Sequence, residues 1–454
     1  MRDLYTGIRR RLKQVFDRSG SERFKRNFLQ ALPLWVASLI VGLAAVLFAR
    51  LFFWAEEGSR YVYHQWGGWL FLVTPACFIL AWYLVRRMAP FASGSGIPQV
   101  MAAIQLEKPG TEKKVGRLLS LRIILVKMMS SLVMVLGGGA IGREGPTIQI
   151  AGSIFRQTNR LLPRWWPKIT AGSMIMTGSA AGLAAAFNTP LGGVVFAVEE
   201  LTRTHISHFK TALFTAVIIA GLAAQGILGP YLYLGYPDLG GLSGNIFLLV
   251  LVVAVLSGLA GSIMCRIIFR IIRWRNTFRS DYKMVLYVTA CALVMAALAV
   301  FTDHRVMGSG KDLMQQSLFT GDKHCAWYVP GLRFIGPVFS FTTGASGGVF
   351  APSLSAGSSI GSLFSGWFHL DNADSNMLIL AGMVGFLTGV TRTPFTSAIL
   401  VLEMTDRHNV IFYLMLAGMV AGIAAYLVDK RSLYDKLKQT YIAALEQPPV
   451  PGPA

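Results

Sequence analysis

Long apolar segments limit what this chain can fold into more than any other feature. Each is close to the roughly 20 residues that a helix needs to cross a bilayer, and short polar loops separate them. The composition agrees, because 54% of the 454 residues are hydrophobic and only 14% are charged, against about 25% in soluble domains. The sequence therefore predicts an all-α integral membrane protein with many crossings. The main segments are 28–54, 69–85, 211–228, 246–268, 285–301, 377–402 and 410–428.

The charge of the chain is strongly basic, with 42 basic and 22 acidic residues and a net charge of +20. Such a balance often indicates nucleic-acid binding. Here the basic residues cluster in short loops between apolar segments, as in 270–283 with four arginines and one lysine. This is the positive-inside pattern. We therefore expect a multi-pass protein of the cell membrane that contacts lipid, not nucleic acid, with both termini in the cytoplasm.

The chain divides into one large membrane domain and two short ends. Residues 1–27 carry nine basic side chains, with apolar residues at helical spacing between them, which predicts an amphipathic helix on the cytoplasmic surface. Residues 28–436 form the membrane domain. Residues 437–454 are expected to be a short cytoplasmic tail.

The sequence Gly-Arg-Glu-Gly-Pro at 142–146 follows an apolar segment, 123–136. A carboxylate at membrane depth is costly and points to function. Glycines let backbone N–H groups approach an ion closely, and a helix N-terminus carries partial positive charge. The motif therefore predicts an anion cradle that holds its own anion, Glu144. The alternative is a Gly-rich surface loop.

An internal repeat divides the membrane domain into halves of about 28–230 and 245–430. Four residues recur at an offset of 204, and 142–146 resembles 348–352 at an offset of 206. Repeated halves with helices interrupted by Gly or Pro are typical of secondary transporters, whose broken helices point their N-termini at an anionic substrate. The four recurring pairs are Gly178 and Gly382, Thr189 and Thr393, Pro190 and Pro394, and Glu199 and Glu403.

Four features in chain order resemble the CLC family of chloride channels and chloride/proton exchangers. They are Gly-Ser-Gly-Ile-Pro at 94–98, Gly-Arg-Glu-Gly-Pro at 142–146, Gly-Gly-Val-Phe-Ala-Pro at 347–352, and Tyr434. The resemblance covers about residues 28–436. It implies a two-halved inverted repeat of tilted and broken helices, a homodimer with one pore per subunit, and no cofactor. Without room for the cytoplasmic CBS-domain pair that eukaryotic members usually carry, the chain looks like a compact prokaryotic member.

The resemblance also implies a set of anion-binding residues. The hydroxyls of Ser95 and Tyr434 would donate to the anion, and serine at this position implies chloride rather than nitrate. Backbone N–H groups would complete the shell, while Arg143 would raise the potential near the outer mouth without coordinating the ion. Simpler roles stay open: a helix cap for Ser95, an interfacial anchor for Tyr434, and packing for the apolar members. The backbone donors are Gly96, Ile97, Gly145, Val349 and Phe350.

Two glutamates carry the expected proton chemistry. By resemblance, Glu144 is the gate: its ionised carboxylate competes with chloride for the cradle, and protonation releases it. Glu200 corresponds to the inner proton-transferring glutamate of the exchangers. The alternatives are an ion pair between Glu144 and Arg143, and a solvated helix end at Glu200.

The segment 99–101, Gln-Val-Met, departs from the acidic residues that often follow this motif in bacterial exchangers. Lys127 then lacks its usual partner, and pairing with Glu200 is one possibility.

We therefore expect a chloride/proton antiporter that moves chloride in exchange for protons. The alternative on the same scaffold is a passive, voltage- or proton-gated chloride channel. An intramembrane enzyme is disfavoured, because the seven histidines fall mainly in or beside loops and form no metal or nucleophile pattern. The four cysteines are scattered and predict neither a disulfide framework nor a metal site.

Overall fold

The structure is a computed structural model that describes residues 22–446, apart from 164, 202–209, 230–231, 279 and 322, and apart from the side chains of 22–27. Most of the expected N-terminal surface helix therefore lies outside the described residues. The residues from Glu22 onward begin the long helix α2. The first part of the expected C-terminal tail, up to residue 446, belongs to helix α19.

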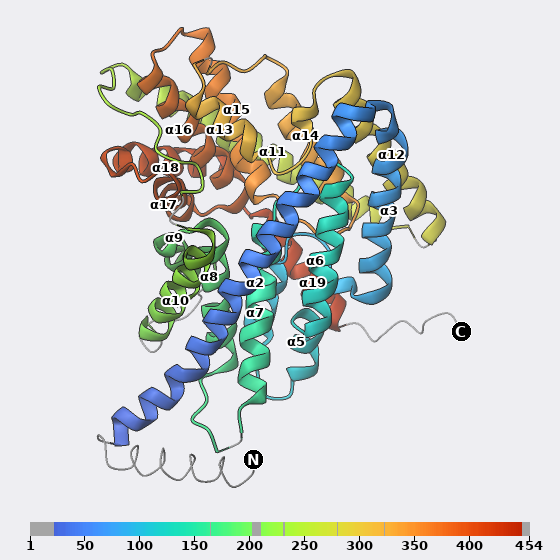
Figure 1. Cartoon of the computed structure of the whole chain (residues 1–454), viewed down its shortest axis with the longest axis vertical. Helices are drawn as coiled ribbons and strands as arrows, with labels where there is room; N and C mark the ends of the chain where they lie inside the picture. Colours follow the sequence, from blue (N-terminus) through green and yellow to red (C-terminus); the bar gives the residue numbers. More distant parts are fainter. Residues whose placement is uncertain are drawn as a thin grey trace.

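The described residues form helices and no strand (Figure 1). Seven helical segments among them are long and apolar enough to cross a membrane, which confirms the predicted all-α membrane protein. The helices of the first half are α2 (Glu22–Trp66), α3 (Leu70–Met88), α4 (Ile97–Leu106), α5 (Glu112–Leu118), α6 (Leu121–Leu136), α7 (Glu144–Leu161), α8 (Ala171–Phe187), α9 (Pro190–Phe196) and α10 (Lys210–Leu228).

The described residues of the second half form nine further α-helices. Its most buried member, α16, lies between α11, α15 and α18. The helices are α11 (Ile246–Arg275), α12 (Asp281–Phe301), α13 (Lys311–Phe319), α14 (Val329–Thr342), α15 (Phe350–Trp367), α16 (Asn372–Thr391), α17 (Pro394–Thr405), α18 (Ile411–Val428) and α19 (Leu433–Glu446).

Two helices run further than the apolar pattern predicts. Helix α2 continues through the polar residues 56–65, because the turn-forming pair Gly67-Gly68 comes only after Trp66. Helix α7 continues through the polar residues 156–160 to Leu161. Its Arg156 is buried there and donates to the carbonyl oxygens of Leu119 and Glu112, both at 2.9 Å.

The Thr-Pro breaks of the internal repeat are present in both halves. Asn188 ends α8 with φ 57° and Arg392 ends α16 with φ 67°, both in the left-handed region. The next helices, α9 and α17, then start at proline, which suits the first position of a helix. Helices α9 and α17 pack against each other across the two halves. The two-halved repeat of broken helices is therefore confirmed.

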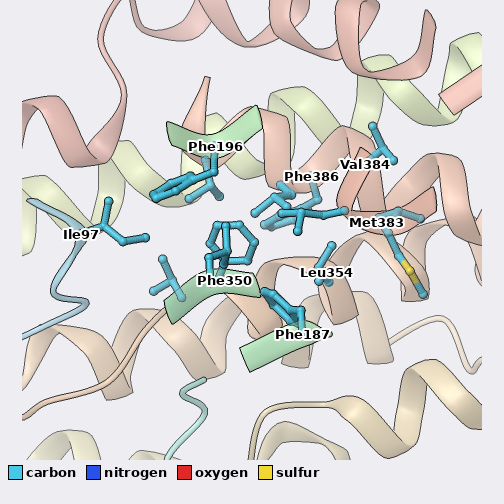
Figure 2. Packing of buried hydrophobic residues seen from close by; sticks show 14 of the residues in the cluster. Ile97, Phe187, Phe196, Phe350, Leu354, Met383, Val384 and Phe386 are labelled. Carbon is cyan, nitrogen blue, oxygen red and sulfur yellow. The ribbon is translucent and has the colours of Figure 1, made fainter. Parts of the chain in front are cut away.

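Aromatic side chains from both halves pack together at the centre of the molecule (Figure 2). The rings of Phe187 and Phe350 have centroids 5.6 Å apart, and Phe196 and Ile97 belong to the same cluster. Each is at most 1% exposed. These residues lie at the ends of α4, α8, α9 and α15, so their packing holds those four helix ends together.

Candidate anion site and proton pathway

Backbone hydrogen bonds hold three Gly-rich turns together at the centre of the molecule. Gly142 and Gly348 exchange two N–H···O bonds of 2.8 Å. Gly94 donates to the carbonyl of Ala345 at 2.9 Å, and Gly347 donates to the carbonyl of Gly94 at 3.1 Å. Helices α4, α7 and α15 begin within a few residues of these turns. Three helix N-termini, each with unsatisfied N–H groups and partial positive charge, are therefore brought together.

Glycine is required at two points in this arrangement. Gly96 has φ +105°, which L side chains rarely adopt, and a Cβ there would lie 2.8 Å from the carbonyl oxygen of Gly145. A Cβ on Gly145 would collide with the hydroxyl of Ser95. The turn at 94–96 therefore lies directly against the start of α7.

Ser95 and Tyr434 come together from opposite ends of the chain, as predicted. Ser95 is 1% exposed and Tyr434 is fully buried. Their hydroxyls lie next to each other, yet neither makes a hydrogen bond of normal geometry. Buried polar groups are nearly always partnered. Two adjacent buried hydroxyls without partners therefore indicate a place for a ligand that accepts hydrogen bonds.

The predicted backbone donors lie at helix starts in the same region. Gly96 precedes the first residue of α4, Ile97, and Val349 precedes the first residue of α15, Phe350. The side chains of Ile97, Val349 and Phe350 are buried and pack in the hydrophobic core. Their N–H groups belong to first turns, where a helix offers donors without intrahelical acceptors. The packing and donor roles are therefore compatible.

Glu144 is the first residue of α7 and is completely buried. Neither carboxylate oxygen has a hydrogen bond of normal geometry, although the N–H groups of Glu144 itself and of Ala351 lie close enough to act on it. The structure contradicts the alternative of an ion pair with Arg143, whose guanidinium donates to the carbonyl of Ala186 at 3.3 Å. The carboxylate lies instead at the N-termini of α7 and α15.

Arg143 lines a pocket of about 430 Å³ together with Arg50 and Lys311. Of these, Arg143 and Lys311 lie close enough to Glu144 for the charges to interact, without forming an ion pair with it. This placement agrees with a positive potential beside Glu144.

Glu200 lies in a one-turn π-helical segment, Ala197–Leu201, that follows α9. It is partly buried and lines a separate cavity of about 380 Å³. Tyr434 is close enough to both Glu144 and Glu200 for their charges to act on it. The residues that line this cavity include Met101, Ile104, Glu107, Met176, Glu200 and Lys438.

Glu199, the neighbour of Glu200, has a different position. Its carboxylate accepts the N–H groups of Phe395 and Thr396 at 3.2 and 2.7 Å, and the Thr396 hydroxyl at 2.7 Å. It therefore caps the start of α17. Glu403 caps the start of α9 in the same way, accepting the N–H groups of Leu191 and Gly192 at 2.9 and 2.6 Å. Sequence reasoning missed these reciprocal caps, although the Glu199 and Glu403 repeat was their signal.

Lys127 is fully buried and donates to the carbonyl oxygens of Ala92 and Gly94 at 3.0 and 2.7 Å. The suggested pairing with Glu200 is therefore wrong. Gln99 also binds this turn, donating to the carbonyl of Ser93 at 2.6 Å. Both side chains position the turn that carries Ser95, because they satisfy carbonyl oxygens in and beside it.

Comparison with known proteins identifies the family. The family model described as voltage gated chloride channel matches residues 77–426. The chain belongs to this family. It is 30% identical over 434 residues to the H(+)/Cl(-) exchange transporter ClcA of Cronobacter sakazakii, covering 90% of this chain and 89% of that protein. A ClcA of Klebsiella pneumoniae is 27% identical over 430 residues, covering 90% and 88%.

Solved structures of CLC proteins share the fold. A slow cyanobacterial Cl-/H+ antiporter superposes with a TM-score of 0.78 at 23% identity, covering 92% of this chain and 99% of that one. A CLC-type fluoride/proton antiporter gives 0.74 at 22% identity, covering 91% and 98%. The related proteins are named as transporters and not as enzymes.

Proposed function

We propose that this protein is a chloride/proton antiporter of the cell membrane. One observation carries the proposal: two glutamates, Glu144 and Glu200, lie close enough to one central hydroxyl, that of Tyr434, for their charges to act on it. The named ClcA relatives exchange the same two ions. A passive channel needs a gate but no second titratable group on the inner side.

The anion in this proposal binds between the Ser95 and Tyr434 hydroxyls and the backbone N–H groups of Gly96, Ile97, Val349 and Phe350. All of these donors are neutral. Transport requires binding that is strong enough to admit the ion and weak enough to release it. A bare ammonium or guanidinium at low dielectric would hold chloride much more tightly. Neutral dipoles at helix N-termini therefore suit a transported anion.

Glu144 is the gate in this proposal. Its ionised carboxylate lies beside the N–H groups of α7 and α15 and so competes with chloride for that position. When it takes up a proton it loses its negative charge and no longer attracts those dipoles. Chloride replaces it there. Anion and proton binding at the outer half of the path are thereby linked.

Glu200 carries protons on the inner side, where the paths of the two ions separate. Chloride passes Ser95 and Tyr434, which offer hydrogen bonds but do not ionise readily near neutral pH. A proton needs a titratable carrier, and Glu200 supplies one on the wall of the inner cavity.

We further propose the arrangement in the membrane that the basic loops and the family imply. The loop regions 107–117 and 270–283 face the cytoplasm, and both chain ends lie on that side. Two copies associate as a homodimer with one pore in each subunit.

A flux assay on purified protein in liposomes tests the function. A chloride gradient is imposed, and a chloride electrode and a pH electrode record both ions in the same sample. The expected result is uphill proton movement driven by chloride, abolished when the chloride gradient is collapsed. Chloride flux without linked proton flux would establish the channel alternative instead.

A further inference from the structure

Glu107 shares the inner cavity with Glu200. It follows the last residue of α4, is partly buried, and lines the same space of about 380 Å³. Gly172, near the start of α8, lies beside it, because a Cβ placed there would be 4.0 Å from the Cβ and Cγ atoms of Glu107. The carboxylate therefore stands where the cavity is bounded by the loop after α4 and the start of α8.

The cavity is large enough to hold several water molecules, since one molecule occupies about 30 Å³ in the liquid. Its wall combines polar groups with apolar side chains such as Met101 and Met176. Water in such a space can connect two carboxyl groups that do not touch. A proton route between Glu107 and Glu200 therefore needs no further side chain.

Other carboxylates near Glu200 are occupied elsewhere. Glu199 caps α17 and Glu403 caps α9, each through backbone N–H groups. Asp435 pairs with the ammonium of Lys438 at 2.8 Å. Among the described residues that line this cavity, Glu107 and Glu200 are the two carboxylates.

We propose that Glu107 is the residue through which protons pass between the cytoplasm and Glu200. This inference rests on the proposed exchange function and names the inner access point of its proton path. In the inward direction, protonated Glu200 gives its proton to cavity water, and that water gives a proton to ionised Glu107. Glu107 then releases a proton to cytoplasmic water and returns to the carboxylate. Only O–H bonds form and break, so the sequence is balanced.

The surroundings of Glu107 favour proton exchange. Burial raises the pKa of Glu107 above its ordinary value, the charge of Glu112 raises it further, and the charge of Arg156 opposes the rise. A pKa closer to the working pH makes both uptake and release of the proton fast. The other charged groups on this cavity are Glu200 and Lys438, the latter balanced by Asp435.

The position of Glu107 in the chain also agrees with this role. It begins a loop followed by Lys108, Lys113 and Lys114, the basic region that we place in the cytoplasm. Glu107 is half-buried while Lys108 is exposed. The carboxylate therefore lies at the boundary between the cavity and the cytoplasmic surface.

Three variants test the proposal in the liposome assay: Glu107→Gln, Glu107→Asp and, as a matched control, Glu112→Gln. Glu112 acts on Glu107 by charge but does not line the cavity. Chloride-driven proton flux is measured at a series of pH values set equal on both sides. Glu107→Gln should slow proton flux by about tenfold to a hundredfold while chloride flux is largely kept, so the chloride-to-proton ratio should rise. Glu107→Asp should retain most of the flux with a shifted pH profile. Glu112→Gln should keep the maximal flux of the wild type, with the midpoint of its pH profile moved to lower pH because the charge of Glu112 raises the pKa of Glu107.

Wild-type proton flux in Glu107→Gln would overturn the proposal, since water alone would then serve Glu200. Chloride binding by calorimetry checks that the variant is folded. If Glu107→Gln fails to bind chloride, the pH profile of Glu107→Asp decides: a shifted midpoint supports the proposal and an unchanged midpoint refutes it. Absence of linked proton flux in the wild type would instead refute the antiport function itself, so the two failures are distinguishable.

Discussion

The chain uses the same Gly-Ser-Gly turn twice, once before α4 at 94–96 and once before α13 at 308–310. In both copies the two glycines have positive φ, +62° and +105° in the first and +65° and +82° in the second. Ser95 and Ser309 are both buried. The two halves therefore share the backbone conformation of this turn and differ in the groups that contact it.

In the second copy the protein fills the turn itself. Glu56 of α2 accepts the N–H of Ser309 at 2.7 Å, and the Ser309 hydroxyl accepts the N–H of Lys311 at 3.4 Å. In the first copy the Ser95 hydroxyl has no partner. Both turns precede a helix N-terminus, which favours negative charge. The second half uses this property for structure, because the Glu56 carboxylate binds there. In the function that we propose, the first half leaves the turn open for an ion.

The same asymmetry recurs at the other repeated motifs. Glu144 stands at the position that Phe350 occupies in the second half, and Glu200 at the position of Met404. Phe350 and Met404 are both buried in the core. Where the halves keep the same residue, as at Glu199 and Glu403, that residue holds helices together. Where they differ, the first half carries the titratable group.

The largest expected effect comes from Glu144→Gln. The amide cannot ionise to compete with chloride or take up a proton, so chloride-driven proton movement should disappear while chloride still permeates. The control is Glu56→Gln, which neutralises the carboxylate at the second-half turn and should keep proton coupling. Both are measured as ion fluxes in liposomes. Uphill proton uptake in Glu144→Gln, or loss of coupling in Glu56→Gln, would contradict the division between the halves.

The next effect in size is that of Glu200→Gln. Proton flux should stop while chloride flux stays within a few-fold of the wild type, since the anion ligands are untouched. The control is the adjacent Glu199→Gln, which should remain coupled because Glu199 faces α17. The chloride-to-proton ratio in liposomes is the measurement. A wild-type ratio in Glu200→Gln would show that the inner proton carrier lies elsewhere.

A smaller effect is expected at the two serines. Ser95→Ala removes one hydroxyl donor and should weaken chloride binding by about tenfold to a hundredfold, because a hydrogen bond to a charged group contributes about 1.5–3 kcal/mol. Ser95→Pro also removes a backbone donor and should shift preference from chloride toward nitrate. Ser309→Ala should leave both unchanged. Calorimetric affinities for the two anions measure this, and equal affinities in wild type and Ser95 variants would exclude Ser95 as a ligand.

Much of the fold was predictable because the membrane imposes simple rules. Apolar length identified the crossings, and the repeated Thr-Pro pair identified the breaks at 189–190 and 393–394. The ends of α2 and α7 were not predictable from hydropathy, because polar residues can continue a helix until a turn-forming residue intervenes. Hydropathy indicates which residues favour an apolar environment, but it does not show at which residue a helix ends.

The candidate site was predictable to the extent that short motifs carry it. The turn at 94–96 and the motif at 142–146 were identified, and the structure brings Ser95 next to Tyr434. The partners of Glu199 and Lys127 were not, because both bind backbone groups of distant segments, and backbone groups carry no sequence signal. The proposed role of Glu107 was not predicted for a related reason. Only the packing of α4, α8 and α19 shows that Glu107 shares a cavity with Glu200.

The smallest predicted effect concerns the reciprocal caps. Each carboxylate satisfies N–H groups at the start of a helix in the other half, and losing such a cap costs about 1 kcal/mol, with a range of roughly 0.5–2. Glu199 accepts three hydrogen bonds and Glu403 accepts two. Glu199→Ala should therefore lower the apparent melting temperature in detergent by a few degrees, and Glu403→Ala by less. Chloride affinity should not change in either, because neither residue belongs to the anion site.

Equal melting temperatures in both variants and the wild type would mean that the caps contribute nothing. A loss of chloride binding would mean that Glu199 and Glu403 serve the ion as well as the fold. That result would contradict the proposed division of roles between the two halves.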